Sequence, residues 1–156
     1  MIGFNNLYFS IVNYVIEKRI MKFSTKTRYG MRAMVEITIA DQKQGIFQKD
    51  ISKNQQISLK YLDHIIQALK TSGLIVNVKG KKSGYRLTRP ASEITMLDIH
   101  TAFEPEIAVI DCMSQHIECE MKEICYTYPF WSGLNKVVED YFNNATLEDL
   151  VKKRKF

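Results

Sequence analysis

The sequence has no long hydrophobic run and little glycine or proline. No apolar stretch reaches the roughly 18 residues that a membrane span needs, and no basic segment precedes an apolar one at the start, so we expect neither a membrane anchor nor a secretory signal. Glycine and proline number only 7 and 3 of 156 residues, which excludes a fibrous or low-complexity chain. These features predict a cytoplasmic protein of one domain, or one domain with an arm.

Cysteine is also scarce. The three cysteines, Cys112, Cys119 and Cys125, are an odd number and do not indicate a disulfide framework. We interpret them as thiols or metal ligands.

Charge is divided unevenly along the chain. Residues 22–90 carry 14 lysines and arginines against 4 aspartates and glutamates, whereas residues 91–150 carry 2 against 12. A basic half of this kind is the electrostatic footprint expected of a protein that binds a polyanion. The alternative is a solvated charged face.

The first half reads as three helices followed by a hairpin. Ser24 or Thr25 is placed to cap a helix that stops near 41–45, and a short helix follows at Gln48–Asn54. Ser58 caps the third helix, Leu59–Thr71, which Gly73 ends. Two β-branched segments, Leu74–Val78 and Tyr85–Arg89, flank a basic turn and predict a β-hairpin. The predicted fold class is mainly α with a small β-hairpin, a winged helix-turn-helix.

The second half predicts a helix at Met96–Glu104, a non-periodic loop over 106–126, a long helix from Pro129 to about Asn143, and a short helix at Leu147–Lys152. The long helix has a broad apolar face that we expect to pair with a second copy in a homodimer, the alternative being packing on its own subunit. Its dimerisation residues are Trp131, Leu134, Val137, Val138 and Tyr141.

The expected division of the chain has four parts. An N-terminal extension, 1–20, has helical apolar spacing and is either a docking arm or a translation-start artefact. We favour the artefact, because the segment that opens at Met21 looks like a natural beginning. The winged helix-turn-helix follows at 21–90, a linker helix and cysteine loop at 91–127, and the dimerisation helix with a basic tail at 128–156.

The winged helix-turn-helix suits double-stranded DNA. Its third helix is narrow enough for the major groove, where exposed side chains reach bases and phosphates and Asp63 can accept from a cytosine amino group. The wing reaches the adjacent backbone or minor groove, and the first helix holds a phosphate. The predicted DNA-binding residues are Ser58, Lys60, Tyr61 and Asp63 on the third helix, Lys79, Lys81, Lys82 and Arg86 on the wing, and Lys26 and Arg28 on the first helix.

Three stretches, MKFSTKTRYGMRAM, ISLKYLDHIIQALKTSGLI and VKGKKSGYRL, resemble the Rrf2 family of bacterial transcription regulators, most closely its IscR-type iron–sulfur cluster regulators. The resemblance covers residues 21 to about 152. It implies a homodimer on a partly palindromic operator, and it places Tyr61, Asp63 and Lys79 at family DNA-contact positions.

The cysteines are spaced C-x6-C-x5-C in an acidic loop. Thiolates suit both iron–sulfur clusters and zinc, and spacing does not separate the two; redox thiols without metal are a further reading. The resemblance implies a cluster on the three cysteines. Two features depart from the IscR-type pattern: the first spacing is one residue longer, and Tyr128 stands where a histidine is usual.

The fourth cluster ligand is open. Some relatives take it from the first helix of the partner subunit, but the comparable positions are Arg28 and Arg32, which are not ligands. Among nearby side chains in the loop, His116 is the softest donor and the weak candidate. Whether a cluster would be 2Fe–2S or 4Fe–4S is equally open.

The predicted function is transcription regulation that senses iron–sulfur status, redox state or nitric oxide. The alternatives are a cluster-free regulator of cysteine or other metabolism that responds to a partner protein or small molecule, and a zinc-stabilised protein-interaction module. No enzyme is expected, because His64 and His100 have no matching nucleophile and no glycine loop cradles phosphate.

Overall fold

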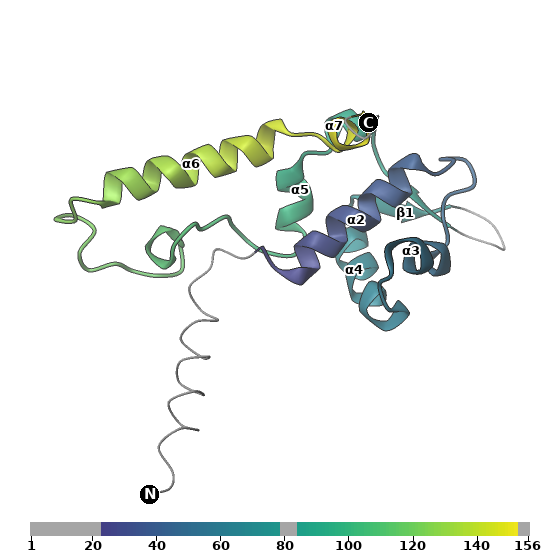
Figure 1. The fold of residues 1–156 in the computed structure, drawn as a ribbon, viewed down its shortest axis with the longest axis horizontal. Helices are drawn as coiled ribbons and strands as arrows, with labels where there is room; N and C mark the ends of the chain where they lie inside the picture. The colour runs from purple at the N-terminus through teal and green to yellow at the C-terminus, as the bar shows by residue number, and fades with distance from the viewer. Residues whose placement is uncertain (1–22, 79–83, 153–156) are drawn as a thin grey trace, which may run out of the picture.

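The computed structural model describes residues 23–78 and 84–152. In chain order the elements are α2 (Thr25–Ile39), α3 (Gln48–Gln55), α4 (Leu59–Thr71), β1 (Ile75–Asn77), β2 (Tyr85–Leu87), the 3-10 turn η1 (Ala91–Glu93), α5 (Met96–Thr101), the 3-10 turn η2 (Asp111–Met113), α6 (Tyr128–Asn144) and α7 (Leu147–Lys152). The predicted mainly helical class with one small hairpin is confirmed (Figure 1). The predicted N-terminal extension and wing tip lie outside the described residues. Within the described ranges, no helix is long and apolar enough to cross a membrane.

Local hydrogen bonds explain where the helices begin and end. The Ser24 hydroxyl accepts from the Thr27 amide at 3.1 Å, and the Ser58 hydroxyl accepts from the Tyr61 amide at 3.3 Å. Gln56 reverses the chain between α3 and α4 with a left-handed φ of 53°, and Gly73 follows α4 with a φ of 69°. The caps predicted from Ser24 and Ser58 are therefore confirmed.

The hairpin is shorter than the sequence predicted, and a residue outside it, Ile46, also pairs with β2. Antiparallel pairing joins Ile75 to Leu87 and Asn77 to Tyr85. Ile46, just before α3, bridges to Tyr85 through two backbone hydrogen bonds of 2.8 and 3.0 Å. A Cβ on Gly84 would lie 2.6 Å from the Gly45 carbonyl carbon, so the close approach of these segments requires glycine there. The base of the wing is thus fixed to the segment that leads into α3.

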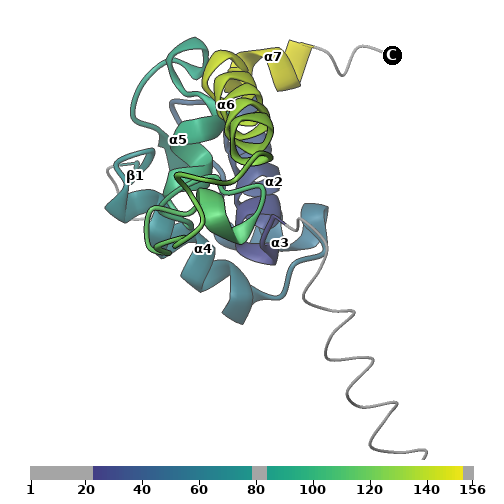
Figure 2. The ribbon, with the colours of Figure 1, turned by 90° about the vertical axis from the view of Figure 1, so that its left-hand side faces the viewer.

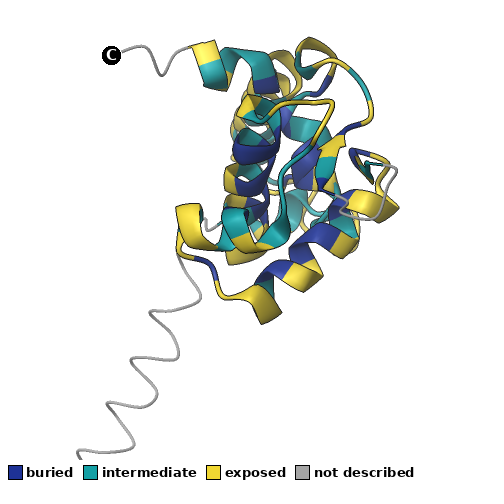
Figure 3. Cartoon of the chain, turned by 90° about the vertical axis from the view of Figure 1, so that its right-hand side faces the viewer, coloured by how far each residue is buried: buried dark blue, intermediate teal, exposed yellow. Residues whose placement is uncertain are grey.

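One hydrophobic core joins both halves of the chain. Met34 and Ile37 of α2 and Ile65 of α4 are fully buried in it, and so are Ile99 of α5 and Leu147 of α7 (Figure 3). The starts of α5 and α7 are also tied by hydrogen bonds from Met96 N to Ala145 O and from Leu147 N to Ile94 O, both 2.8 Å. The core therefore extends past Pro90, where the sequence analysis placed the end of the DNA-binding unit.

Helix α5 ends at Thr101, three residues before the predicted end at Glu104. The residue before a proline is disfavoured in helical conformation, and Glu104 precedes Pro105. The amides of Phe103 and Glu104 both donate to the His100 carbonyl, at 2.9 and 3.0 Å, which closes the last turn. The Glu104 side chain is then free to turn toward α2.

Helix α6 projects from the body and is joined to it at its C-terminal end (Figures 1 and 2). None of its residues is buried. Phe130, Leu134, Val137 and Tyr141 form an exposed apolar stripe, with 39% of Leu134 and 69% of Tyr141 accessible to solvent. Of the residues predicted for dimerisation, Trp131 and Val138 are instead half-buried.

Candidate nucleic-acid interface and cysteine loop

The start of α4 is presented outward by its neighbours. Ile57, just before it, is buried, and its backbone is held by the Ser52 hydroxyl, which donates to the Ile57 carbonyl at 2.6 Å. Arg32 of α2 binds Gln55, through Nε to Oε1 at 2.8 Å and through the guanidinium to the Gln55 carbonyl. These contacts fix α3 against α2 and leave Ser58, Lys60 and Asp63 exposed. An exposed helix start after a tight turn is the geometry with which helix-turn-helix proteins read a groove.

Asp63 is positioned from the wing. Its Oδ1 accepts from the Nε2 amide of the Gln48 side chain. Oε1 of the same Gln48 side chain in turn accepts from the Tyr85 hydroxyl at 3.2 Å. Burial, and next the nearby negative charge of Asp63, raise the pKa of Tyr85, which keeps that hydroxyl a donor. Sequence reasoning selected Asp63 for base contact but missed Gln48, whose position has meaning only once the hairpin lies beside α3.

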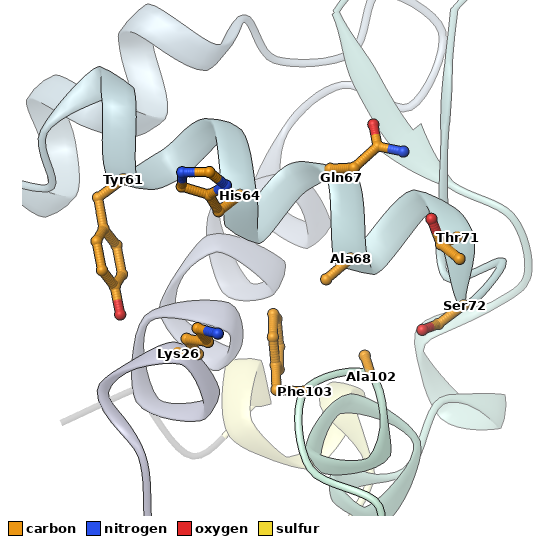
Figure 4. Close-up of a pocket in the computed structure, with 9 residues that line it drawn as sticks. All are labelled: Lys26, Tyr61, His64, Gln67, Ala68, Thr71, Ser72, Ala102 and Phe103. Atoms are coloured by element: carbon orange, nitrogen blue, oxygen red, sulfur yellow. The ribbon is translucent and has the colours of Figure 1, made fainter.

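Lys26 and Tyr61 line one open hollow of about 610 Å³ between α2, α4 and the end of α5 (Figure 4). His64 and Gln67 of α4 line it as well, with Phe103 on its apolar side. The Tyr61 ring is held edge-to-face by Tyr29 with centroids 5.6 Å apart. His64 was not singled out for binding from sequence, because only the fold brings it into one hollow with Lys26 of α2.

The remaining predicted DNA contacts are spread out. Arg28 is exposed at the start of α2 and donates to the Thr25 hydroxyl at 3.2 Å. Arg86 is exposed on β2 and lines a separate hollow with Thr38 at the far end of α2. Lys79, Lys81 and Lys82 lie outside the described residues.

The acidic loop brings two of the three cysteines together. Cys112 and Cys119 line one hollow whose other walls include Glu118, Glu120 and Glu123. Cys125 does not line it; its sulfur lies 3.3 Å from the Thr127 hydroxyl at the start of α6. All three thiols are free and half-buried. Thiolate donors fit an iron–sulfur cluster or zinc chemically, but in the described part of the chain no three His, Cys, Asp or Glu side chains are arranged to hold a metal ion.

Hydrogen bonds hold the first part of the loop, the part that contains Cys112. The Glu106 carboxylate accepts from the Ser114 hydroxyl and from the Gln115 amide, and these bonds, that of Ser114 first, lower the Glu106 pKa. The Val109 amide donates to Asn135 of α6 at 2.9 Å. His116, the candidate fourth ligand, is exposed and does not line the cysteine hollow. The arrangement orders the Cys112 end of the loop and leaves the Cys125 end apart.

A helix-turn-helix followed by a two-stranded wing defines the class, a winged helix-turn-helix DNA-binding protein. The chain belongs to the Rrf2 family, whose sequence profile, described as an iron-dependent transcriptional regulator, matches residues 23–153. The resemblance seen in the sequence is thereby confirmed.

Individual relatives agree. The transcriptional regulator IscR of Pectobacterium atrosepticum is 31% identical over 134 residues, which cover 86% of this chain and 81% of the relative. The solved structure of CymR, the global cysteine regulator of B. subtilis, matches with a TM-score of 0.70 and 27% identity over 86% of this chain and 98% of that one. The structure of T. potens IscR matches with a TM-score of 0.69 and 27% identity over 86% and 88%. The relatives are named regulators, which confirms the prediction of a DNA-binding regulator and not an enzyme.

We predict that Thr127 sets the reactivity of Cys125. Hydrogen bonds from the Thr127 hydroxyl, then from the Thr127 backbone, lower the pKa of the Cys125 thiol below its ordinary value. In a metal-free Cys112→Ser, Cys119→Ser background, Thr127→Val should raise this pKa, measured as the midpoint of the iodoacetamide alkylation rate against pH. Thr127→Ser, which keeps the hydroxyl, is the matched control. An unchanged midpoint in Thr127→Val would show that the hydroxyl does not act on the thiol.

Proposed function

We propose that this Rrf2-family regulator binds DNA through α4 and the wing and senses its signal through an iron–sulfur cluster held by Cys112, Cys119 and Cys125. The observation that carries the proposal is the position of the loop. The three free thiols lie in an acidic segment that is bound to α5 at one end and leads directly into α6 at the other. A change of order in this segment therefore acts on both neighbours.

In the proposed DNA complex, α4 enters the major groove. Lys60 and Tyr61 contact phosphate or base edges, Asp63 accepts from a base, and Ser58 lies at the helix start. Lys26 and Arg28 hold a phosphate beside the hollow that Tyr61 lines. On the wing, Lys79, Lys81, Lys82 and Arg86 reach the adjacent backbone. The exposure of Lys60 and Asp63 and the shared hollow of Lys26 and Tyr61 support these roles.

We predict that Lys60→Ala weakens DNA binding at every sequence. Loss of one phosphate contact should lower the slope of log affinity against log salt by about 0.9. The measurement is a salt titration of a fluorescent duplex that the protein itself selects from a random library. Lys136→Ala removes another exposed lysine, on α6, and should leave affinity and slope unchanged. An unaltered slope in Lys60→Ala would remove α4 from the contact surface.

We further propose that the exposed stripe of α6 pairs with a second copy of the chain. A helix with no buried residue and four large apolar side chains in one stripe gains stability from a covered face. Pairing two such helices would set two α4 helices about one DNA turn apart, as a partly palindromic operator requires.

The stripe also gives a prediction about assembly. Val137→Asp with Tyr141→Asp should yield monomers that still fold, because both side chains are exposed, at 64% and 69%, in the single chain. Operator affinity should fall with the dimer. Lys136→Asp makes the same change in net charge as the double variant, but outside the stripe, and is the control. Sedimentation of the double variant as an intact dimer would contradict the pairing.

The second candidate function is a cluster-free regulator, favoured by one observation: Cys125 does not line the hollow of Cys112 and Cys119. The likeness to CymR, a global cysteine regulator, supports the same reading. Holding one group on all three thiols would require the Cys125 segment to move toward the hollow. When bound, a cluster would hold the three thiolates against one positively charged core and would so order the acidic loop.

We predict a visible absorption spectrum for protein purified without oxygen. Cys112→Ala, Cys119→Ala and Cys125→Ala should each abolish it and should each change affinity for the selected duplex. Couplings of this kind are typically 1–3 kcal/mol, several-fold to about a hundred-fold in affinity. His116→Ala tests the weak fourth-ligand candidate. A colourless protein with no iron or sulfide would favour the cluster-free function, and bound zinc would account for metal without colour.

A further inference from the structure

A partly buried polar contact joins the linker after α5 to the first turn of α2. Oε1 of Glu104 accepts from the Ser24 amide at 3.3 Å and from the Thr27 hydroxyl. Thr27 is fully buried, and Ser24 is the cap of α2. Burial alone raises the pKa of Glu104, but the bonds from Thr27 and Ser24 together with His100 lower it overall. The carboxylate is therefore ionised and fixed at the helix start, where the helix dipole favours a negative charge.

His100 continues the connection. Its ring is 2% exposed and lies edge-to-face against Phe23 and Phe142, with centroids 5.7 Å from each. Nε2 lies 2.9 Å from the Glu106 carbonyl oxygen and so donates to it, because a carbonyl only accepts. Nδ1 faces Glu104 at 3.8 Å and has no hydrogen-bond partner among the described residues. The histidine thus stands between the two glutamates.

Glu106 completes the path to the cysteines. Its carboxylate accepts from the Ser114 hydroxyl and the Gln115 amide, and both of these residues line the hollow of Cys112 and Cys119. Ser114 follows Cys112 by two residues. Consecutive contacts therefore run from the cysteine hollow through Glu106 and His100 to Glu104 and the cap of α2.

We propose that Glu104 is the positioning residue that couples the cysteine loop to the DNA-binding unit. When Ser114 and the Cys112 end of the loop shift, the Glu106 backbone and His100 shift with them, and the Glu104 contact with Thr27 and Ser24 changes. The first turn of α2, which carries Lys26 and Arg28, then changes its position relative to α4. The inference rests on the proposed DNA binding but not on a cluster, because every contact in it is made by the metal-free chain.

Coupling between two sites is reciprocal, and the test uses this fact. In the full-length metal-free protein, DNA binding should change the iodoacetamide alkylation rate of the loop thiols, read cysteine by cysteine by mass spectrometry, at least threefold. Alkylation should in turn change affinity for the selected duplex. A role in stability alone would not make the thiol rates depend on DNA.

Two variants interrupt the path at different points. Glu104→Gln keeps the shape but removes the charge, and Thr27→Val keeps the shape but removes the donating hydroxyl. Each should bring the DNA-dependent ratio of alkylation rates close to one, with the unalkylated protein still binding DNA. Glu148→Gln, which changes a half-buried glutamate of α7 paired with Lys152, is the control and should keep the wild-type ratio.

The outcomes separate the inference from the proposed function. Failure of the wild-type protein to select or bind any duplex would overturn the proposed function. DNA binding with thiol rates that do not respond to DNA would overturn the coupling and leave DNA binding standing. Thermal unfolding shows which of the Glu104→Gln and Thr27→Val variants are folded. If a folded variant keeps the wild-type ratio of alkylation rates, the role of Glu104 is overturned.

Discussion

The buried face of α2 is the constraint on which the rest of the structure depends. Ala33, Met34 and Ile37 are fully excluded from solvent, and α3, α4, β2, α5 and α7 all pack against this helix. The segment just after α5 approaches α2 so closely that a Cβ on Gly30 would lie 2.2 Å from the Phe103 ring. Since protein interiors are close-packed and relax only partly, a displacement of α5 or its linker is transmitted to α2 and its neighbours. The DNA-binding elements are therefore not mechanically separate from the acidic half.

The two halves share a core but keep opposite charge on their surfaces. The linker, loop and α6 lie on one side of the body, away from α3 and the wing (Figure 1). Residues 91–150 carry 12 acidic side chains and only 2 basic ones, so this side repels a polyanion while the basic half attracts it. The repulsion restricts how DNA approaches, and binding to phosphates does not then compete with the cysteine loop for the same surface.

Sequence reasoning succeeded where the determining interactions are local. The predicted caps at Ser24 and Ser58 each bond an amide three residues away, and the start and end of α4 match the prediction. It did not reach contacts between distant positions. Glu104 and Thr27 are 77 residues apart, and Gln48 meets Asp63 and Tyr85 only because the hairpin packs beside α3. The spacing of the cysteines likewise identified a site chemically but could not show that Cys125 turns toward Thr127, since that depends on where α6 begins.

His100 shows why such contacts matter together. From sequence it was a histidine without a matching nucleophile. In the fold its ring packs on Phe142 of α6, its Nε2 bonds the Glu106 backbone of the loop, and its Nδ1 faces Glu104. A buried polar atom without a hydrogen bond costs about 1–3 kcal/mol, and Nδ1 has none among the described residues. The ring is held instead by the Nε2 hydrogen bond to Glu106 and by packing on Phe23 and Phe142. Any change in how α6 is seated or how the loop is ordered alters that packing. Pairing of α6 with a second copy and ordering of the cysteine loop would therefore act on the same side chain, one contact away from the helix that presents Lys26 and Arg28.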